Sequence, residues 1–106
     1  MNAAVEKDIR RHGAVIAALC RRQGVRRLDL FGSATRNDFD AQHSDVDFLV
    51  EFEDLEPAQY AQAYFELKEG LERLFGRSVD LVTENNLDNP YFRRRVESER
   101  QNLYAR

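Results

Sequence analysis

Hydrophobic positions along the chain follow a helical spacing in two long segments. The first segment runs from about residue 3 to residue 22, and Gly24 follows it as a stop signal. The second starts at Pro57, a residue suited to the first turn of a helix, and Gly76 closes it. We therefore predict two amphipathic helices. Their apolar stripes consist of Val5, Ile9, Val15 or Ile16, and Leu19 in the first, and Tyr60, Tyr64, Leu67, Leu71 and Leu74 in the second.

Three shorter segments alternate between apolar and polar residues, which is typical of strands. They span residues 25–31, 46–52 and 78–83. Side chains two positions apart on a strand share a face, so one face of each strand should enter the core. The expected core positions are Leu28 and Leu30, then Val46, Phe48, Val50 and Phe52, then Val79 and Leu81, with Arg27 and Asp29 on the opposite face of the first strand.

The C-terminal segment has the pattern of a last helix. Asn89 is a good capping residue, and Pro90 is favoured at the first helical position. Apolar residues then continue to Tyr104. We therefore predict a third helix that starts near Asn89 and runs through Tyr91, Phe92, Val96, Leu103 and Tyr104.

Composition and charge narrow the class of protein. A chain of 106 residues with 42% hydrophobic content predicts a single folded domain over residues 1–106. The 16 basic and 19 acidic residues give a net charge of −3, which argues against autonomous nucleic-acid binding. The single cysteine, Cys20, fits a reducing compartment. Without a signal peptide or an apolar span of about 20 residues, we expect a cytoplasmic protein without membrane contact.

The candidate chemistry lies in two motifs. Gly32 and Ser33 end the first predicted strand, and Asp45 and Asp47 open the second. Two carboxylates spaced in this way point to the same side of a sheet, where their like charges repel. Mg²⁺ resolves that conflict because it binds carboxylate oxygens together with substrate phosphates. The Gly-Ser turn can offer backbone N–H groups and a hydroxyl to phosphate oxygens.

A third acid, Asp80, lies between Val79 and Leu81, so its side chain should face away from the core. By itself it would be an ordinary surface residue of an amphipathic strand. If its strand pairs beside residues 46–52, however, three acids can converge on one face. Two-metal chemistry then becomes possible, with ions about 3.5–4 Å apart.

These motifs resemble the DNA-polymerase-β-like nucleotidyltransferase superfamily. The closer similarity is to the minimal nucleotidyltransferases, the short antitoxin partners of HEPN-domain toxins. The similarity covers nearly the whole chain and depends on residues 30–34, 44–52 and 79–82, which are LFGSA, SDVDFLVEF and VDLV. It implies an α/β (α+β) fold: a small mixed β-sheet with helices packed on one face, the polymerase-β-like nucleotidyltransferase core.

The resemblance also implies a role for each motif residue. Asp45 and Asp47 would hold two Mg²⁺ ions, which also touch the phosphates of ATP. Asp80 would serve the catalytic ion and help to deprotonate the incoming hydroxyl. All three acids are therefore expected to be both metal ligands and catalytic residues, and Gly32 and Ser33 are expected to contact the nucleotide.

Other polar residues near the motifs have two interpretations each. Arg36 can offer its guanidinium to a phosphate or a partner, or it can be an exposed loop residue. Ser44 is included among the nucleotide-binding residues, and its alternatives are to end the loop or to support the backbone of Asp45. Asn37 replaces a glycine that many relatives have, and asparagine tolerates a left-handed backbone best among the other residues. His43 is expected to be an exposed loop histidine.

The predicted activity is Mg²⁺-dependent transfer of AMP from ATP to a hydroxyl group. No residues are left over for an acceptor-binding domain, so a partner must supply the second wall of the site. The resemblance implies a HEPN toxin with an acceptor tyrosine, in a type VII-like toxin–antitoxin pair. Two alternatives stay open: an antitoxin that acts by binding alone, and a subunit of an adenylyltransferase for small molecules such as antibiotics.

Overall fold

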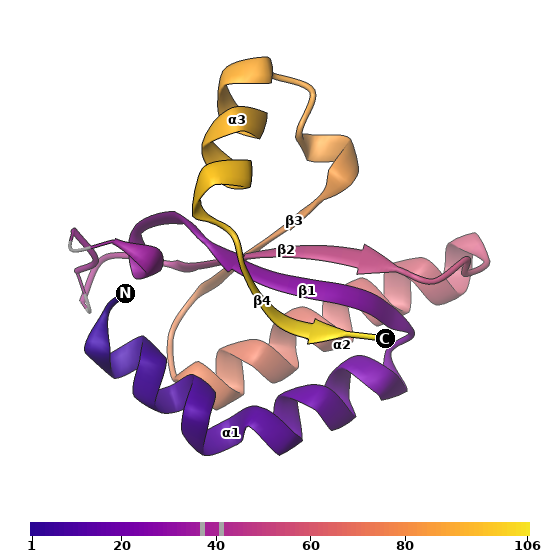
Figure 1. Ribbon diagram of the computed structural model, residues 1–106. Helices are drawn as coiled ribbons and strands as arrows, with labels where there is room; N and C mark the ends of the chain where they lie inside the picture. The colour runs from indigo at the N-terminus through magenta and orange to yellow at the C-terminus, as the bar shows by residue number, and fades with distance from the viewer. Residues whose placement is uncertain (37, 41) are drawn as a thin grey trace.

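The computed structural model describes residues 1–36, 38–40 and 42–106 (Figure 1). Within them no helix is both long and apolar enough to cross a membrane. The elements in chain order are α1 (Ala3–Arg22), β1 (Val25–Phe31), the 3₁₀ helix η1 (Gly32–Thr35), β2 (Val46–Phe52), α2 (Pro57–Phe75), β3 (Val79–Thr83), the 3₁₀ helix η2 (Glu84–Asn86), α3 (Pro90–Glu99) and β4 (Gln101–Ala105).

Local capping explains the bounds of the two long helices, which agree with the sequence prediction. The Asn2 side chain accepts hydrogen bonds from two backbone N–H groups in the first turn of α1. At the start of α2, Glu56 and Gln59 cap one another's backbone, and Pro57 occupies the first turn. Gly76 ends α2 in the left-handed conformation, with φ of 63°, which glycine adopts without a steric penalty.

The four strands form one mixed sheet in the order β3-β2-β1-β4. β2 and β3 are parallel, whereas β1 is antiparallel to both of its neighbours. The third strand lies beside the second, which is the condition under which the predicted acids can converge, and β3 starts at Val79 and not at residue 78. The register places Asp47 opposite Asp80 on β3 and opposite Phe31 on β1. This register brings two of the predicted acids side by side.

The main hydrophobic core lies between the sheet and the helices α1 and α2, which cover its lower face in Figure 1. The predicted core positions of all three strands contribute to it, including Leu28, Phe48 and Leu81. Val15 and Ile16 are the predicted alternatives for one core position on α1. Ile16 is buried, whereas Val15 is 51% exposed, so Ile16 occupies that position.

The short helix α3 packs on the other face of the sheet, above it in Figure 1. Its Val96 is fully buried in a second, smaller cluster, whose other buried members are Phe31, Leu49, Val82 and Leu87. Asp47 and Asp80 alternate with core residues on their strands and therefore lie on this same face. The acids are thus on the side of the sheet that α3 covers only in part.

The prediction of a helix through Tyr104 is wrong. α3 ends at Glu99, Arg100 has extended backbone angles, and Gln101–Ala105 form β4 along the free edge of β1. The edge of β1 offers unpaired backbone groups, and pairing with them outweighs a weak helical pattern. The turn at Arg100 is important for the site because it fixes the position of Glu99.

Asp29 lies on the face of β1 that was expected to be polar, but it is buried. Its side chain is 0% exposed. Its carboxylate accepts hydrogen bonds from Arg100 Nε at 2.6 Å, Asn102 Nδ2 at 2.9 Å and Arg27 Nε at 3.2 Å. Burial by itself raises the pKa of this carboxyl, but these partners outweigh burial and hold the pKa below its ordinary value. The buried Asp29–Arg100 pair therefore ties the end of α3 to the sheet.

Candidate active site

The three predicted acids gather where β2 and β3 begin. Asp45 precedes β2 by one residue and is exposed, Asp47 is the second residue of β2 and is half-buried, and Asp80 is the second residue of β3 and is exposed. Because β2 and β3 are parallel, both strands present their acids at the same edge of the sheet.

Asp47 is at the electrostatic centre of this group. Its pKa rises to about 6, first because the carboxyl is partly buried and then because the negative charges of Asp80 and Asp45 face it. Arg36 opposes this effect and Glu99 adds to it. The negative charges of Asp80 and Asp45 therefore act on the carboxyl of Asp47 and disfavour its ionisation.

The described residues contain no group of three or more His, Cys, Asp or Glu side chains arranged to hold a metal ion. The donor set nevertheless suits a hard divalent cation, because it consists of carboxylate oxygens, and burial together with the charges of Asp80 and Asp45 raises the pKa of Asp47.

The Gly-Ser turn lies directly against Asp47. Gly32 has φ of 77°, and a Cβ added there would lie 2.0 Å from Oδ2 of Asp47. The turn is closed by Thr35 Oγ1, which donates to the Gly32 carbonyl at 2.7 Å, and by the Arg36 N–H, which donates to the Ser33 carbonyl at 3.0 Å. Only glycine fits at this contact, because both its backbone angle and its lack of a side chain are needed.

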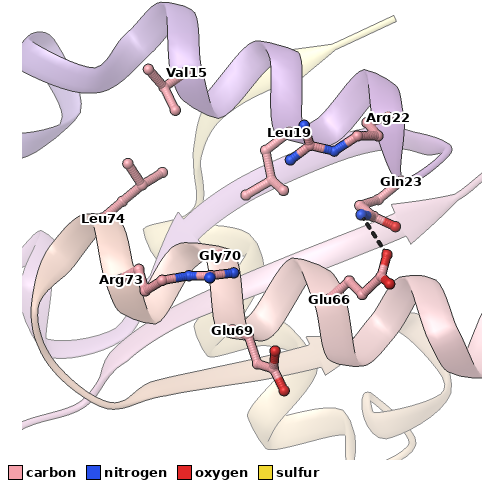
Figure 2. Close-up of a pocket in the computed structure, with 9 residues that line it drawn as sticks. All are labelled: Val15, Leu19, Arg22, Gln23, Glu66, Glu69, Gly70, Arg73 and Leu74. Atoms are coloured by element: carbon pink, nitrogen blue, oxygen red, sulfur yellow. Dashed lines mark hydrogen bonds between the residues drawn. The ribbon is translucent and has the colours of Figure 1, made fainter.

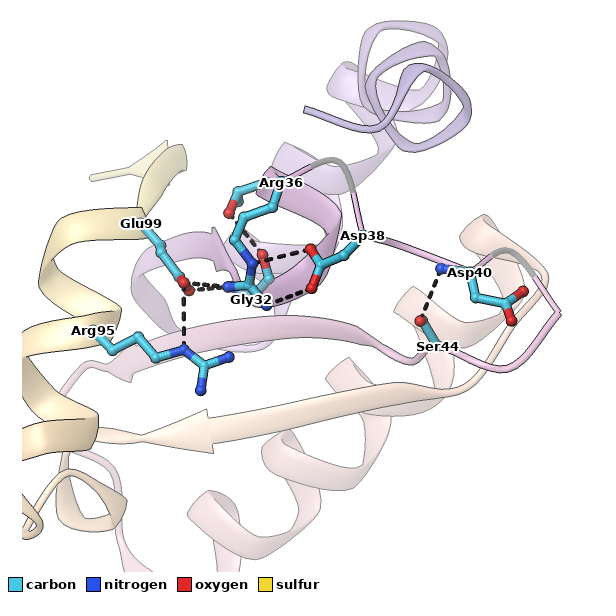
Figure 3. Close-up of polar contacts among 8 residues, drawn as sticks. Gly32, Arg36, Asp38, Asp40, Ser44, Arg95 and Glu99 are labelled. Atoms are coloured by element: carbon cyan, nitrogen blue, oxygen red, sulfur yellow. Dashed lines mark hydrogen bonds and ion pairs between the residues drawn. The ribbon is translucent and has the colours of Figure 1, made fainter.

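Glu99 lies against the Gly-Ser turn, and its position is not evident from the sequence. Figure 3 shows its carboxylate beside Gly32, Arg36 and Arg95. Oε2 accepts the Gly32 N–H at 3.0 Å, Oε1 pairs with Nη1 of Arg36, and Arg95 Nε lies 3.4 Å from the same oxygen. A glutamate inside an expected helix does not indicate a contact with a distant turn. Glu99 reaches the Gly-Ser turn because α3 ends at this residue.

The loop between η1 and β2 places the remaining candidates. Arg36 donates to Asp38 Oδ1 at 3.0 Å as well as pairing with Glu99. Ser44 does not contact the acids by hydrogen bond; its hydroxyl accepts the Asp40 N–H at 2.9 Å, which agrees with its alternative role in the loop. His43 is exposed, as expected, and its Nδ1 lies 2.7 Å from Asp40 Oδ2. The prediction for Asn37 lies outside the described residues.

Two other features lie away from the acids. Cys20 is buried in the main core, and burial raises the pKa of its thiol to about 12, so it is not a nucleophile. Figure 2 shows a pocket of about 560 Å³ between α1 and α2, on the side of the sheet opposite Asp47. Its lining includes Arg22, Arg73 and Leu74, together with Gln23, which donates to Glu66 Oε2 at 2.8 Å.

The family of this chain follows from comparison with known proteins. The nucleotidyltransferase domain family matches residues 14–103, and the chain belongs to this family. Among its relatives is the protein adenylyltransferase MntA of Thermococcus cleftensis, which is 44% identical over 66 residues, or 62% of this chain and 63% of MntA. The chain is therefore a nucleotidyltransferase, an enzyme, with protein adenylyltransferases among its homologues.

Solved structures share its fold. A structure provisionally described as a minimal nucleotidyltransferase matches with a TM-score of 0.72 and 34% identity, over 95% of each chain. A complex of a tri-AMPylated HEPN toxin of Shewanella oneidensis with an MNT antitoxin matches with a TM-score of 0.60 and 22% identity, over 92% of this chain and 73% of the other. The polymerase-β-like nucleotidyltransferase fold that the motifs predict is confirmed.

Proposed function

We propose that this enzyme transfers AMP from Mg²⁺-bound ATP to a tyrosine hydroxyl of a HEPN toxin and thereby acts as the antitoxin of the pair. The observation that carries the proposal is the contact of Gly32 with Asp47, which itself is opposite Asp80 in the sheet. A phosphate-binding turn and paired carboxylates are then a few ångströms apart, as transfer of a nucleotidyl group requires.

In this proposal Asp45, Asp47 and Asp80 would hold Mg²⁺, which when bound would neutralise charge on the phosphates and act as a Lewis acid. The backbone N–H groups and hydroxyl of the Gly32-Ser33 turn orient the phosphates. Asp80 is the acid on the outer strand of the sheet and is exposed. It is therefore open to a hydroxyl that arrives from a partner, and in this proposal it accepts the proton of that hydroxyl.

The proposal that the acceptor is a HEPN toxin is based on the names of two similar proteins. MntA of Thermococcus cleftensis is named a protein adenylyltransferase, and the Shewanella complex contains an AMPylated HEPN toxin. The acids lie at the edge of the sheet where β2 and β3 begin, with Asp45 and Asp80 exposed, and the pocket between α1 and α2 is on the other side of the sheet. A partner that covers this edge would exclude water and bring its own hydroxyl into line with the α-phosphate.

The experiment incubates the chain with labelled ATP, Mg²⁺ and its cognate HEPN toxin, and locates the label by mass spectrometry of peptides. Wild-type enzyme should label one or more tyrosines of the toxin. Asp47→Asn should reduce the rate on the order of a hundredfold or more, since it removes a carboxylate that would hold the metal. Asp54→Asn, which changes an exposed acid beyond the far end of β2, is the matched control and should retain the wild-type rate.

Labelling of the toxin by Asp47→Asn at a rate within tenfold of wild type would overturn the assignment of the acids. Label on an added small hydroxyl compound and not on the toxin would instead support the small-molecule adenylyltransferase. A stable complex with the toxin but no label in it would favour an antitoxin that acts by binding alone.

A further inference from the structure

A carboxylate of the chain itself occupies the position where the proposed function needs a phosphate. The Gly32 N–H, which the proposal gives to the nucleotide, donates to Glu99 Oε2 at 3.0 Å. Two guanidinium groups complete the surroundings, since Arg36 and Arg95 both contact Oε1 of the same glutamate. We call this set of donors, the Gly32 N–H with the Arg36 and Arg95 side chains, the anion site.

The donors of the anion site suit a phosphate as well as they suit a carboxylate. A backbone N–H in a tight turn and guanidinium forks are donors that proteins use for both groups, and charge-assisted bonds of this kind are the strong ones. The Glu99 side chain is only 13% exposed, so its carboxylate fills the site and is not merely near it. A phosphate oxygen and Glu99 Oε2 cannot accept the same N–H with full strength.

The charge balance also opposes simultaneous occupancy. Asp47 already faces Asp45, Asp80 and Glu99, with Arg36 as the compensating cation. A triphosphate would add several negative charges to this group. If Glu99 stayed, Arg36 would be shared between two anions, whereas departure of Glu99 would free Arg36 and Arg95 for the phosphates.

We propose that Glu99 is a built-in competitor for the phosphate-binding position, and that its side chain leaves the anion site when the nucleotide binds. The inference rests on the proposed function and adds Arg95 to the residues that contact the phosphates. The backbone need not move, because Glu99 is the last residue of α3 and its neighbour Arg100 is held by the buried Asp29 at 2.6 Å. Rotation of the Glu99 side chain alone opens the site.

The test uses inorganic tripolyphosphate without metal, and follows the amide signal of Gly32 by ¹⁵N NMR together with calorimetry. Glu99→Gln keeps a side-chain oxygen for the Gly32 N–H but removes the competing charge, and should bind tripolyphosphate about tenfold more tightly than wild type. Glu97→Gln is the matched control, because it removes the same charge from α3 two residues away, where Glu97 pairs with Arg100 and is half exposed. It should bind as wild type does.

A second variant separates competition from support of the turn. Arg95→Gln should weaken tripolyphosphate binding in the Glu99→Gln background, because Arg95 then contacts the ligand directly. Equal or weaker binding by Glu99→Gln than by wild type would overturn the inference and make Glu99 a residue that holds the turn in shape. A Gly32 amide signal that does not respond to tripolyphosphate in any variant would also overturn it.

These outcomes are independent of catalysis. Glu99→Gln can bind tripolyphosphate more tightly while no label is transferred to any toxin. This result would refute the proposed function but would support Glu99 as a competitor for the phosphate. Conversely, label can be transferred to the toxin at a normal rate while Glu99→Gln binds tripolyphosphate no more tightly than wild type. This result would support the proposed function but would refute Glu99 as a competitor.

Discussion

Gly32 and Asp47 are in contact across the β1–β2 ladder, and the contact leaves no room for a methyl group. An added Cβ would lie 2.0 Å from Asp47 Oδ2 and 2.9 Å from its Cγ, and the backbone there has φ of 77°. The backbone of Gly32 therefore limits where the carboxylate of Asp47 can lie. A larger residue at position 32 would displace the Asp47 side chain.

Gly32→Ala should consequently lower both stability and activity. The positive φ costs about 1–2 kcal/mol for a residue with a side chain, and the clash would push the Asp47 carboxylate from its position. We expect a lower melting temperature and a loss of label transfer on the order of a hundredfold. Gly13→Ala is the control, since nothing lies within 4 Å of its added Cβ, and it should leave transfer unchanged. Full activity of Gly32→Ala would show that the contact has no role in positioning.

Crowding of the acids predicts an unusual response of stability to metal. In chelator, Asp47→Asn should melt at the same temperature as wild type or higher, because it removes a negative charge that faces Asp45 and Asp80. In Mg²⁺, wild type should gain more stability than the variant, since binding to the folded state stabilises it. Melting curves of both proteins in the two buffers give the comparison. A clearly lower melting temperature of Asp47→Asn in chelator would mean that the acid stabilises the fold itself.

The buried Asp29 should make stability depend on acid pH. Its pKa is lower in the folded chain than in the unfolded one, so its contribution to stability is present above about pH 4 and is lost as the pH falls through the folded pKa. Asp29→Asn should destabilise the chain by roughly 2 kcal/mol or more near neutral pH, because Arg100 keeps a weaker partner.

The measurement is urea unfolding in chelator at about pH 5.5 and about pH 3.5, around the ordinary pKa of aspartate. Between these values wild type should lose more stability than Asp29→Asn, and Asp54→Asn should behave as wild type does. An equal loss in Asp29→Asn and in wild type would contradict the assigned role of the carboxylate.

The sequence was sufficient for most of the fold, for reasons that are local. α1 and α2 have strong apolar stripes and explicit caps, and the alternation along β2 and β3 puts Asp47 and Asp80 on the face away from the main core. Such features depend on neighbours one to four residues away, and they are therefore visible in the pattern.

The sequence pattern did not predict the features that long-range contacts determine. β4 forms because β1 has a free edge, and its own residues have no strong strand pattern. Asp29 is buried because Arg100 and Asn102, more than 70 residues later, cover it. Glu99 reaches Gly32 across 67 positions for the same reason, and no spacing rule connects the two residues.

The most direct test of AMPylation as the mechanism of neutralisation compares protection of cells from the HEPN toxin by wild type and by Asp80→Asn at matched expression. Asp80 is exposed and its side chain lies outside both hydrophobic clusters, so the variant should fold and should still form the complex, which co-purification checks. Wild type should protect the cells and leave AMP on the toxin, and Asp80→Asn should do neither. Equal protection by both proteins would contradict AMPylation as the mechanism, because binding alone would then be sufficient for neutralisation.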